Sequence, residues 1–116
     1  MKPGDTFLAP DAFGKHLNVV IAVLPDGSVI HCHLTSLQNR SDTTCVIEPK
    51  EHSFVKHRTV VRYDAVQICE DGVQLEALER VIEKKFEAVS KELLDRIRQG
   101  ALDSPQTPDK VKEILK

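Results

Sequence analysis

The chain has 116 residues, of which 41% are hydrophobic and 29% charged, and its formal net charge is −2. This is ordinary globular composition, and we expect residues 1–116 to form a single domain with a hydrophobic core. Aromatic residues make up only 4% and include no Trp, which argues against a nucleic-acid surface built from stacked aromatic rings. The net charge excludes a chain-wide basic field, so nucleic acid would have to bind a local patch.

The cysteines and the N-terminus indicate the compartment. Cys32, Cys45 and Cys69 are an odd number without CxxC spacing, so we expect free thiols in the core and a reducing environment. The opening MKPGDTFLAP has no apolar leader region, and no run approaches the roughly 18 apolar residues that span a bilayer. We therefore expect a cytoplasmic protein without membrane contact.

Residues 1–70 have the pattern of a β-barrel. Short apolar or alternating runs predict five to six antiparallel strands, within residues 5–8, 16–24, 28–36, 43–49 and 59–69. HLNVVIAVL is nearly continuous and suits a strand that is buried on both faces. Asp26-Gly27 predicts a hairpin turn to the next strand, because both residues tolerate positive φ. Strands this short with frequent turns favour a small, SH3-like barrel.

From residue 71 the period changes to three and four, which predicts a helical extension over 71–116. Apolar residues recur between Gly72 and Gly100 with this spacing, as one helix or as two with a break near residues 87–90. Ser90 is the expected N-cap of the second helix, and Gly100 is its expected C-cap. Thr107 and Pro108 are the expected N-cap and first residue of a last helix. The predicted class is thus α+β.

The segment VIHCHLTS, residues 29–36, places two histidines on one face of a strand. One face would have Val29, His31, His33 and Thr35, and the other Ile30, Cys32, Leu34 and Ser36. We expect the second face to turn inward and the histidine face to line a polar pocket. Three interpretations compete for the histidines: a metal site, an acid–base site, or a polar outer surface without a function.

A metal site would need a third ligand. His31 and His33 would lie roughly 6.5–7 Å apart along the strand, close enough to share zinc if His52, His57 or Glu51 completed the set. An HxH pair alone is weak evidence, so we assign no metal ion and no cofactor to this chain.

Acid–base chemistry would suit cleavage of RNA. Such a reaction needs one group to deprotonate the 2′-hydroxyl, another to protonate the leaving 5′-oxygen, and cations or hydroxyls for the charged phosphorane. The segment EHSFVKHRTVVRY supplies candidates within eleven residues: His52, Lys56, His57, Arg58, Thr59 and Arg62. All five histidines lie in the β half, so we expect the sheet to provide the site.

The order of motifs from Lys2 to Ile68 resembles the PemK/MazF family of bacterial toxins. KPGDTFLAP resembles the opening of that family, HLNVVIAV its next strand, VIHCHLTS the strand that ends in Thr-Ser, and KHRTVVRYDAVQI a later segment. The resemblance implies a small SH3-like barrel and metal-independent cleavage of single-stranded RNA. It also implies a cognate antitoxin as partner and a homodimer.

Two features depart from the family pattern. The Arg-Pro pair that usually introduces the second strand is missing, and Lys15-His16 replace it. The helical tail from Gln74 is longer than in typical members and, with the H-x-F-x-x-H segment, resembles a divergent branch encoded on mobile elements. By position, His16 replaces the arginine that takes part in catalysis, and Thr35 with Ser36 match the active-site hydroxyls.

Two sets of candidate residues follow from the residues and the resemblance together. The expected catalytic residues are His16, His31, His33, Thr35, His57 and Arg58. The expected substrate-binding residues are Lys15, Ser36, His52, Lys56, Thr59 and Arg62. Because the arginine is absent, a second interpretation remains open, in which the barrel is a non-catalytic module that binds protein or nucleic acid. A histidine-based metal enzyme or sensor is the third.

Overall fold

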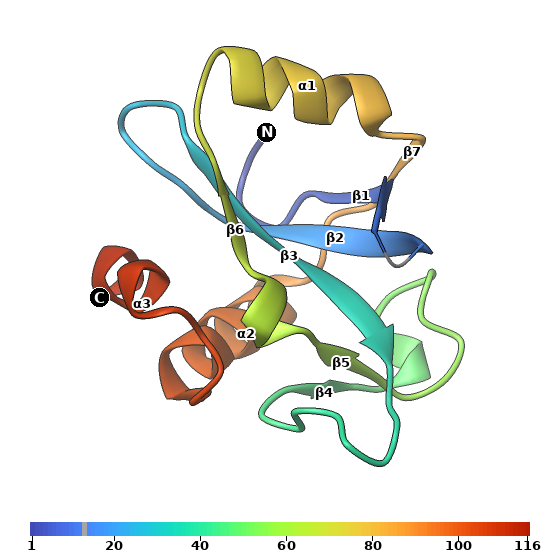
Figure 1. Cartoon of the computed structure of the whole chain (residues 1–116). Coiled ribbons are helices and arrows are strands. Elements are labelled where there is room, and N and C mark those ends of the chain that lie inside the picture. The colour runs from blue at the N-terminus through green and yellow to red at the C-terminus, as the bar shows by residue number, and fades with distance from the viewer. Residues whose placement is uncertain (13) are drawn as a thin grey trace.

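The protein is described by a computed structural model that covers residues 1–12 and 14–116. Figure 1 shows a small, barrel-like antiparallel sheet with three helices. The strands are β1 (Thr6–Asp11), β2 (Gly14–Val23), β3 (Val29–Ser36), β4 (Val46–Ile47), β5 (Thr59–Val61), β6 (Gln67–Cys69) and β7 (Lys84–Phe86). The helices are α1 (Val73–Val81), α2 (Lys91–Asp103) and α3 (Asp109–Leu115), and short 3₁₀ turns span Pro49–Glu51 and Tyr63–Ala65. The predicted α+β class, a small barrel followed by C-terminal helices, is confirmed.

Strand β3 is the centre of the sheet. The strand order is β4-β5-β3-β2-β1-β7, and the first half of β3 pairs with β6 while its second half pairs with β5. The turn from β2 to β3 is the predicted Asp26-Gly27 hairpin. Gly27 has φ +90°, and the Asp26 carboxylate accepts a hydrogen bond from the Ser28 amide at 2.9 Å.

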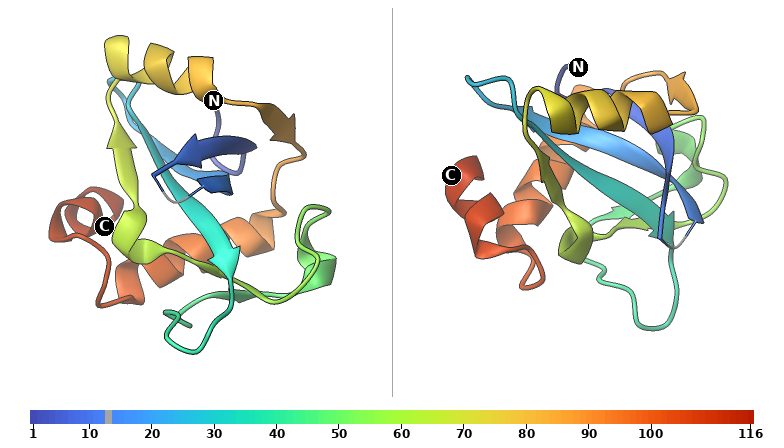
Figure 2. Two further views of the ribbon diagram at one scale, coloured as in Figure 1. Left: turned by 45° about the vertical axis from the view of Figure 1, so that its right-hand side comes forward. Right: turned by 45° about the horizontal axis from the view of Figure 1, so that its top comes forward.

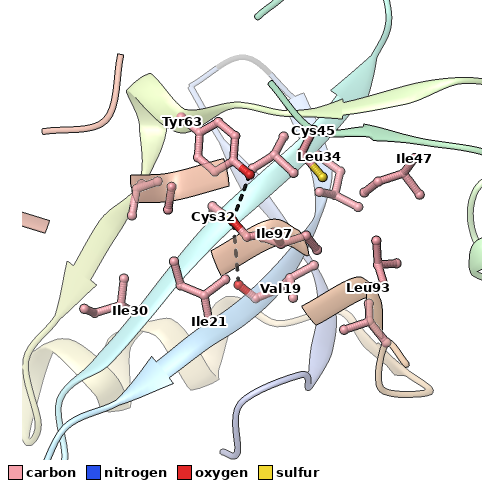
Figure 3. Close-up of a cluster of buried hydrophobic side chains, with 14 of the residues drawn as sticks. Val19, Ile21, Ile30, Cys32, Leu34, Cys45, Ile47, Tyr63, Leu93 and Ile97 are labelled. Atoms are coloured by element: carbon pink, nitrogen blue, oxygen red, sulfur yellow. Dashed lines mark hydrogen bonds between the residues drawn. The ribbon is translucent and has the colours of Figure 1, made fainter. Parts of the chain in front are cut away.

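One face of the β2–β3 pair packs against the C-terminal helices. Figure 3 shows Val19, Ile21 and Cys32 in one buried cluster with Leu93 and Ile97 of α2. The Tyr63 hydroxyl donates a 2.8 Å hydrogen bond to the Ile97 carbonyl. Cys32, Cys45 and Cys69 are buried free thiols, and burial raises the pKa of Cys32 to about 12. The prediction of cysteines as small core residues is confirmed.

The other face of β2 and β3 is also covered. Helix α1 lies across one end of it, as Figures 1 and 2 show, and packs there over Phe7, Val20 and Val29. The remaining residues on this face are polar, and those at its far end form the candidate site described below. Strand β2 is therefore buried on both faces, as its continuous apolar run predicted. None of the helices in the described residues is both long and apolar enough to cross a bilayer.

The first predicted helix is too long. Periodicity extended it through Phe86, but α1 ends at Val81 and residues 84–86 form β7, which pairs antiparallel with β1. Pairing with an open sheet edge outweighs local periodicity here. The second predicted helix begins as expected, because the Ser90 hydroxyl accepts a hydrogen bond from the Leu93 amide at 3.1 Å.

Gly100 is not a C-cap, because α2 continues to Asp103. Its position is explained by packing: a Cβ at this residue would overlap the buried Tyr63 hydroxyl and ring. The prediction for the last helix is also wrong in detail. Pro108 is the N-cap of α3, and the buried Thr107 hydroxyl has no hydrogen-bond partner within the part of the chain that the structure describes.

We predict that Gly100→Ala destabilises the protein by about 1–3 kcal/mol, although alanine is otherwise preferred to glycine inside a helix. The reason is the overlap with Tyr63, so Tyr63→Phe should recover part of the loss. Chemical unfolding monitored by circular dichroism measures both effects. Asp95→Ala, at an exposed position of the same helix, serves as the control and should change stability little. A Gly100→Ala protein more stable than wild type would contradict the packing explanation.

Candidate functional site

Two adjoining pockets meet at the end of β3 and share His16, Thr35 and Ser36. We call the combined depression the His16 groove. One part is also lined by residues of the segment that precedes β5, and its lining is Lys15, His16, Leu17, Leu34, Thr35, Ser36, Phe54, Val55, Lys56, His57 and Thr59. The other part is lined by His16, Thr35, Ser36, Gln38, Arg40, Ser41, Asp42, Arg62, Asp64 and Gln106. The groove thus brings together segments 15–17, 34–42 and 54–64.

A hydroxyl–imidazole pair lies in this groove. The Ser36 Oγ and the His57 Nε2 are 2.6 Å apart, a short hydrogen bond. The backbone fixes both residues, since the Thr59 hydroxyl donates to the His57 carbonyl at 2.9 Å and Ser36 pairs with Thr59 across β3 and β5. His57 itself is exposed. The imidazole can therefore accept the hydroxyl proton and still reach a ligand in the groove.

His16 lies at the junction of the two pockets, with His33 and Asp11 behind it. Its ring is stacked on that of His33, with centroids 4.4 Å apart and planes inclined by 18°. The Asp11 carboxylate faces a nitrogen of each ring, 3.7 Å from His16 Nε2 and 3.4 Å from His33 Nδ1. Burial lowers the pKa of His33, and the nearby His16 lowers it further, while Asp11 acts in the opposite direction.

Positive charge lines the pocket beside β5. Among the described residues that line it, Lys15 and Lys56 are charged and no carboxylate occurs, although Lys15 also forms a 2.9 Å ion pair with Glu83. The other pocket has mixed charge. Its Arg62 guanidinium forms two hydrogen bonds with Asp64, at 2.8 and 2.9 Å, and this pairing lowers the pKa of the carboxyl group. An anion would therefore bind more favourably in the lysine-lined part.

His31 does not reach the groove. Its alternation with Cys32 is as predicted, but the histidine face is not exposed: the side chain is buried against Phe7, and its Nδ1 donates to the Asn18 Oδ1 at 3.0 Å. Burial, with a smaller contribution from the neighbouring His33, lowers the pKa of His31 to about 4. His31 is thus a neutral core histidine in this structure.

His52 and Arg58 also lie away from the groove. The buried His52 ring donates from Nε2 to the Glu87 carbonyl at 2.8 Å and accepts at Nδ1 from the Phe54 amide at 3.1 Å. Arg58 extends outward and pairs with Glu48 at 3.1 Å. The expected substrate-binding role of His52 and catalytic role of Arg58 therefore lack a direct geometric basis. His31 and His52 point to different partners, so they cannot share a metal ion with His33 here.

Three residues in or behind the groove escaped prediction. Asp11 lies on the same sheet face as His16 because Ala9 pairs with His16, a register that the hairpin near residues 11–14 could have indicated. The sequence indicates Phe54 only as part of the H-x-F-x-x-H segment. Its ring packs edge-on against Phe86 of β7, with 5.2 Å between centroids, and the sequence pattern does not predict that strand. Arg40 reaches the groove from an irregular loop, for which the sequence offers no periodic signal.

The chain was compared with known proteins. No protein-family model and no curated protein matches it. A solved structure described as an endoribonuclease in complex with its cognate antitoxin, from a mycobacterial species, matches with a TM-score of 0.62 at 12% identity. The match covers 93% of this chain and 97% of the other, so it includes the sheet and the C-terminal helices. At this identity the similarity shows a shared fold.

We predict that His31 makes the protein less stable in acid. The pKa of His31 is lower when folded, about 4, than the usual 6.5, so the unfolded chain takes up its proton first as the pH falls. The stabilisation is complete above pH 6.5 and declines by roughly 3 kcal/mol towards pH 4. Urea unfolding in buffer containing EDTA measures this, with His31→Leu for comparison. An equally steep decline in His31→Leu would contradict the assignment.

Proposed function

We propose that this protein is a toxin-like endoribonuclease that cleaves single-stranded RNA in the His16 groove without a metal ion. The observation on which the proposal depends most is the 2.6 Å contact between Ser36 Oγ and His57 Nε2, beside His16 and two lysines. The shared fold with an endoribonuclease supports the same interpretation. The site, the substrate and the metal independence are all part of the proposal.

In the proposed reaction, His57 is the general base and His16 the general acid. His57 takes the proton of a ribose 2′-hydroxyl, and the resulting oxyanion attacks the adjacent phosphorus. His16 gives a proton to the leaving 5′-oxygen, so the P–O bond breaks without a charged leaving group. When the 2′-hydroxyl replaces the Ser36 hydroxyl at His57 Nε2, Ser36 can turn and, with Thr35, donate a hydrogen bond to the phosphorane oxygens. Lys15 and Lys56 balance the charge of these oxygens.

The other residues around the groove have supporting roles in this scheme. His33 and Asp11 orient the His16 ring from behind, since both contact it and neither lines the groove. Thr59 fixes the His57 backbone, and Arg62 provides a cation for RNA that extends into the second pocket. His31 and His52 stabilise the fold that places these groups.

We further propose membership of the PemK/MazF family. Thr35 and Ser36 lie in the groove, where the resemblance places the family's hydroxyls, and His16 lies there in place of the missing arginine. The fold that this chain shares with an antitoxin-bound endoribonuclease supports a cognate antitoxin as partner. A homodimer and a cytoplasmic location belong to the same proposal, as does the folding of residues 1–116 as one domain.

A second candidate function is that of a binding module with the same fold. The replacement of the family's Arg-Pro pair by Lys15-His16 favours it, because that arginine takes part in catalysis. The two functions make different predictions for one experiment. A module would bind RNA or protein in the groove and leave RNA intact, whereas the enzyme would fragment it.

We predict that His57→Ala and His16→Ala each lower the rate of RNA cleavage by about 10²- to 10⁴-fold, which is the usual contribution of a general acid or base. Ser36→Ala should lower it less, because the 2′-hydroxyl can reach His57 directly. The measurement is cleavage of a labelled single-stranded RNA of mixed sequence by purified protein. Lys50→Ala removes an exposed cation outside the groove and is the matched control for Lys56→Ala, which should weaken binding.

Circular dichroism and thermal unfolding must show that each variant is folded before its activity is compared. Cleavage at wild-type rates by both histidine variants would refute the assigned roles. Intact RNA after prolonged incubation with wild-type protein, together with saturable RNA binding, would favour the binding module instead.

We also predict that cleavage continues at an unchanged rate in excess EDTA. In the proposed mechanism every proton transfer and every contact with the phosphorane uses a side chain of the groove. Cleavage by protein that has been stripped of metal and assayed with and without EDTA tests this directly. Activity that disappears on chelation and returns with a divalent cation would contradict the mechanism.

A further inference from the structure

We infer that Asp11, His16 and His33 form a binding site for a divalent transition-metal ion, of which zinc is the best match. Each of the three side chains offers a ligand atom, and these atoms all lie within 4.8 Å of one another. Two neutral imidazoles and a carboxylate are a donor set that zinc accepts, with a further position for water. This set differs from the histidine pair that the sequence indicated, because only His33 belongs to both.

The sheet register places the three residues together. They come from the adjacent strands β1, β2 and β3: Ala9 pairs with His16, and Asn18 pairs with His33, so the ligands occupy diagonal positions on one face. Diagonal side chains on neighbouring strands are within reach of one another. The ligand atoms therefore come from three neighbouring strands of one sheet.

The distances are close to those of a bound ion. Ligand atoms around tetrahedral zinc are about 3.3 Å apart, because each is 2.0–2.1 Å from the metal. The Asp11 carboxylate oxygens lie 3.4 Å from His33 Nδ1 and 3.7 Å from His16 Nε2. The two rings are stacked, so their nitrogens converge on one ion only after the His16 ring rotates. His16 is the histidine at the surface of the pair, with 19% of its side chain exposed against 9% for His33.

A second observation also points to a ligand. The Nε2 atom of His16, the ring nitrogen nearest the Asp11 carboxylate, is buried and has no hydrogen-bond partner among the residues that the structure describes. Buried polar atoms are nearly always paired, so this exception needs an explanation. A metal ion that takes the lone pair of an imidazole nitrogen provides one.

The other candidate ligands are committed elsewhere. The His31 and His52 rings donate to Asn18 and to the Glu87 carbonyl, and the three thiols are buried in the two apolar clusters. Asp11 remains 29% exposed, which leaves the ion a route from solvent. The candidate ligands of the ion are thus the carboxylate and the two imidazoles on this face of the sheet.

Occupancy has a consequence that rests on the proposed function. His16 lines the groove, and its ring can act as the general acid only when both nitrogens carry a proton. An ion that occupies one of these nitrogens therefore prevents His16 from protonating the leaving oxygen. Zinc would then inhibit RNA cleavage, while the metal-free protein would be the active form. Zinc binding and RNA cleavage are measured separately, so failure of one does not imply failure of the other.

The test is titration of untagged, metal-free full-length protein with Zn²⁺ by calorimetry, and with Co²⁺ by visible absorption. We expect one ion per chain, a cobalt spectrum without a thiolate band, and at least about tenfold weaker binding in Asp11→Asn and His16→Gln, each of which removes one ligand. His57→Gln is the matched control, a groove histidine outside the cluster, and should bind as wild type. Far-ultraviolet circular dichroism confirms the fold of each variant.

Three results would overturn the site: no binding at high micromolar zinc, a cobalt–thiolate band, or unchanged affinity in Asp11→Asn. In the cleavage assay, zinc should inhibit wild-type protein and inhibit Asp11→Asn much less, relative to the rate of each without zinc. Equal inhibition of both would show that zinc acts elsewhere and would refute the consequence. A protein that binds zinc as described but cuts no RNA would refute the proposed function and leave the metal site standing.

Discussion

The backbone carbonyl of Glu87 connects the parts of the structure on which the groove depends. It accepts hydrogen bonds from the Thr6 hydroxyl and from His52 Nε2, both at 2.8 Å. The first bond fixes the chain beside β1, and the second fixes the segment that leads to His57. Because His52 donates with one ring nitrogen and accepts with the other, a single neutral tautomer satisfies both contacts. Together with the buried Val55 side chain and the Ser36–His57 contact, this junction holds the segment that contains Lys56 and His57 against the sheet.

The three histidines on one face of the sheet show how position decides chemistry. His31 packs against Phe7 near the end covered by α1, and it is neutral. His33 is buried behind His16, and of the three only His16 reaches the groove. The burial of these side chains increases along the face towards α1. Their ability to contact a ligand decreases in the same direction. A polar stripe on a strand therefore serves stability at one end and the candidate site at the other.

The sequence predicted what depends on local pattern. The alternation in β3, the Asp26-Gly27 turn and the Ser90 N-cap are all confirmed, because each follows from neighbouring residues. The failures involve distant contacts. Residues 84–86 became β7 because they pair with β1, and Gly100 is required by Tyr63. In the site, His16, Thr35, Ser36 and His57 do come together, whereas His31 and Arg58 are separated from them by burial and by an ion pair.

The most direct test of the account is the chemical identity of the RNA ends, determined by mass spectrometry after a single-stranded RNA is incubated with the purified, metal-free protein. Attack by the 2′-hydroxyl, with His57 as base and His16 as acid, predicts a 2′,3′-cyclic phosphate and a 5′-hydroxyl. A substrate with 2′-deoxyribose at the scissile position should remain intact. Products with a 3′-hydroxyl and a 5′-phosphate, or cleavage of the deoxy substrate, would contradict the central claim.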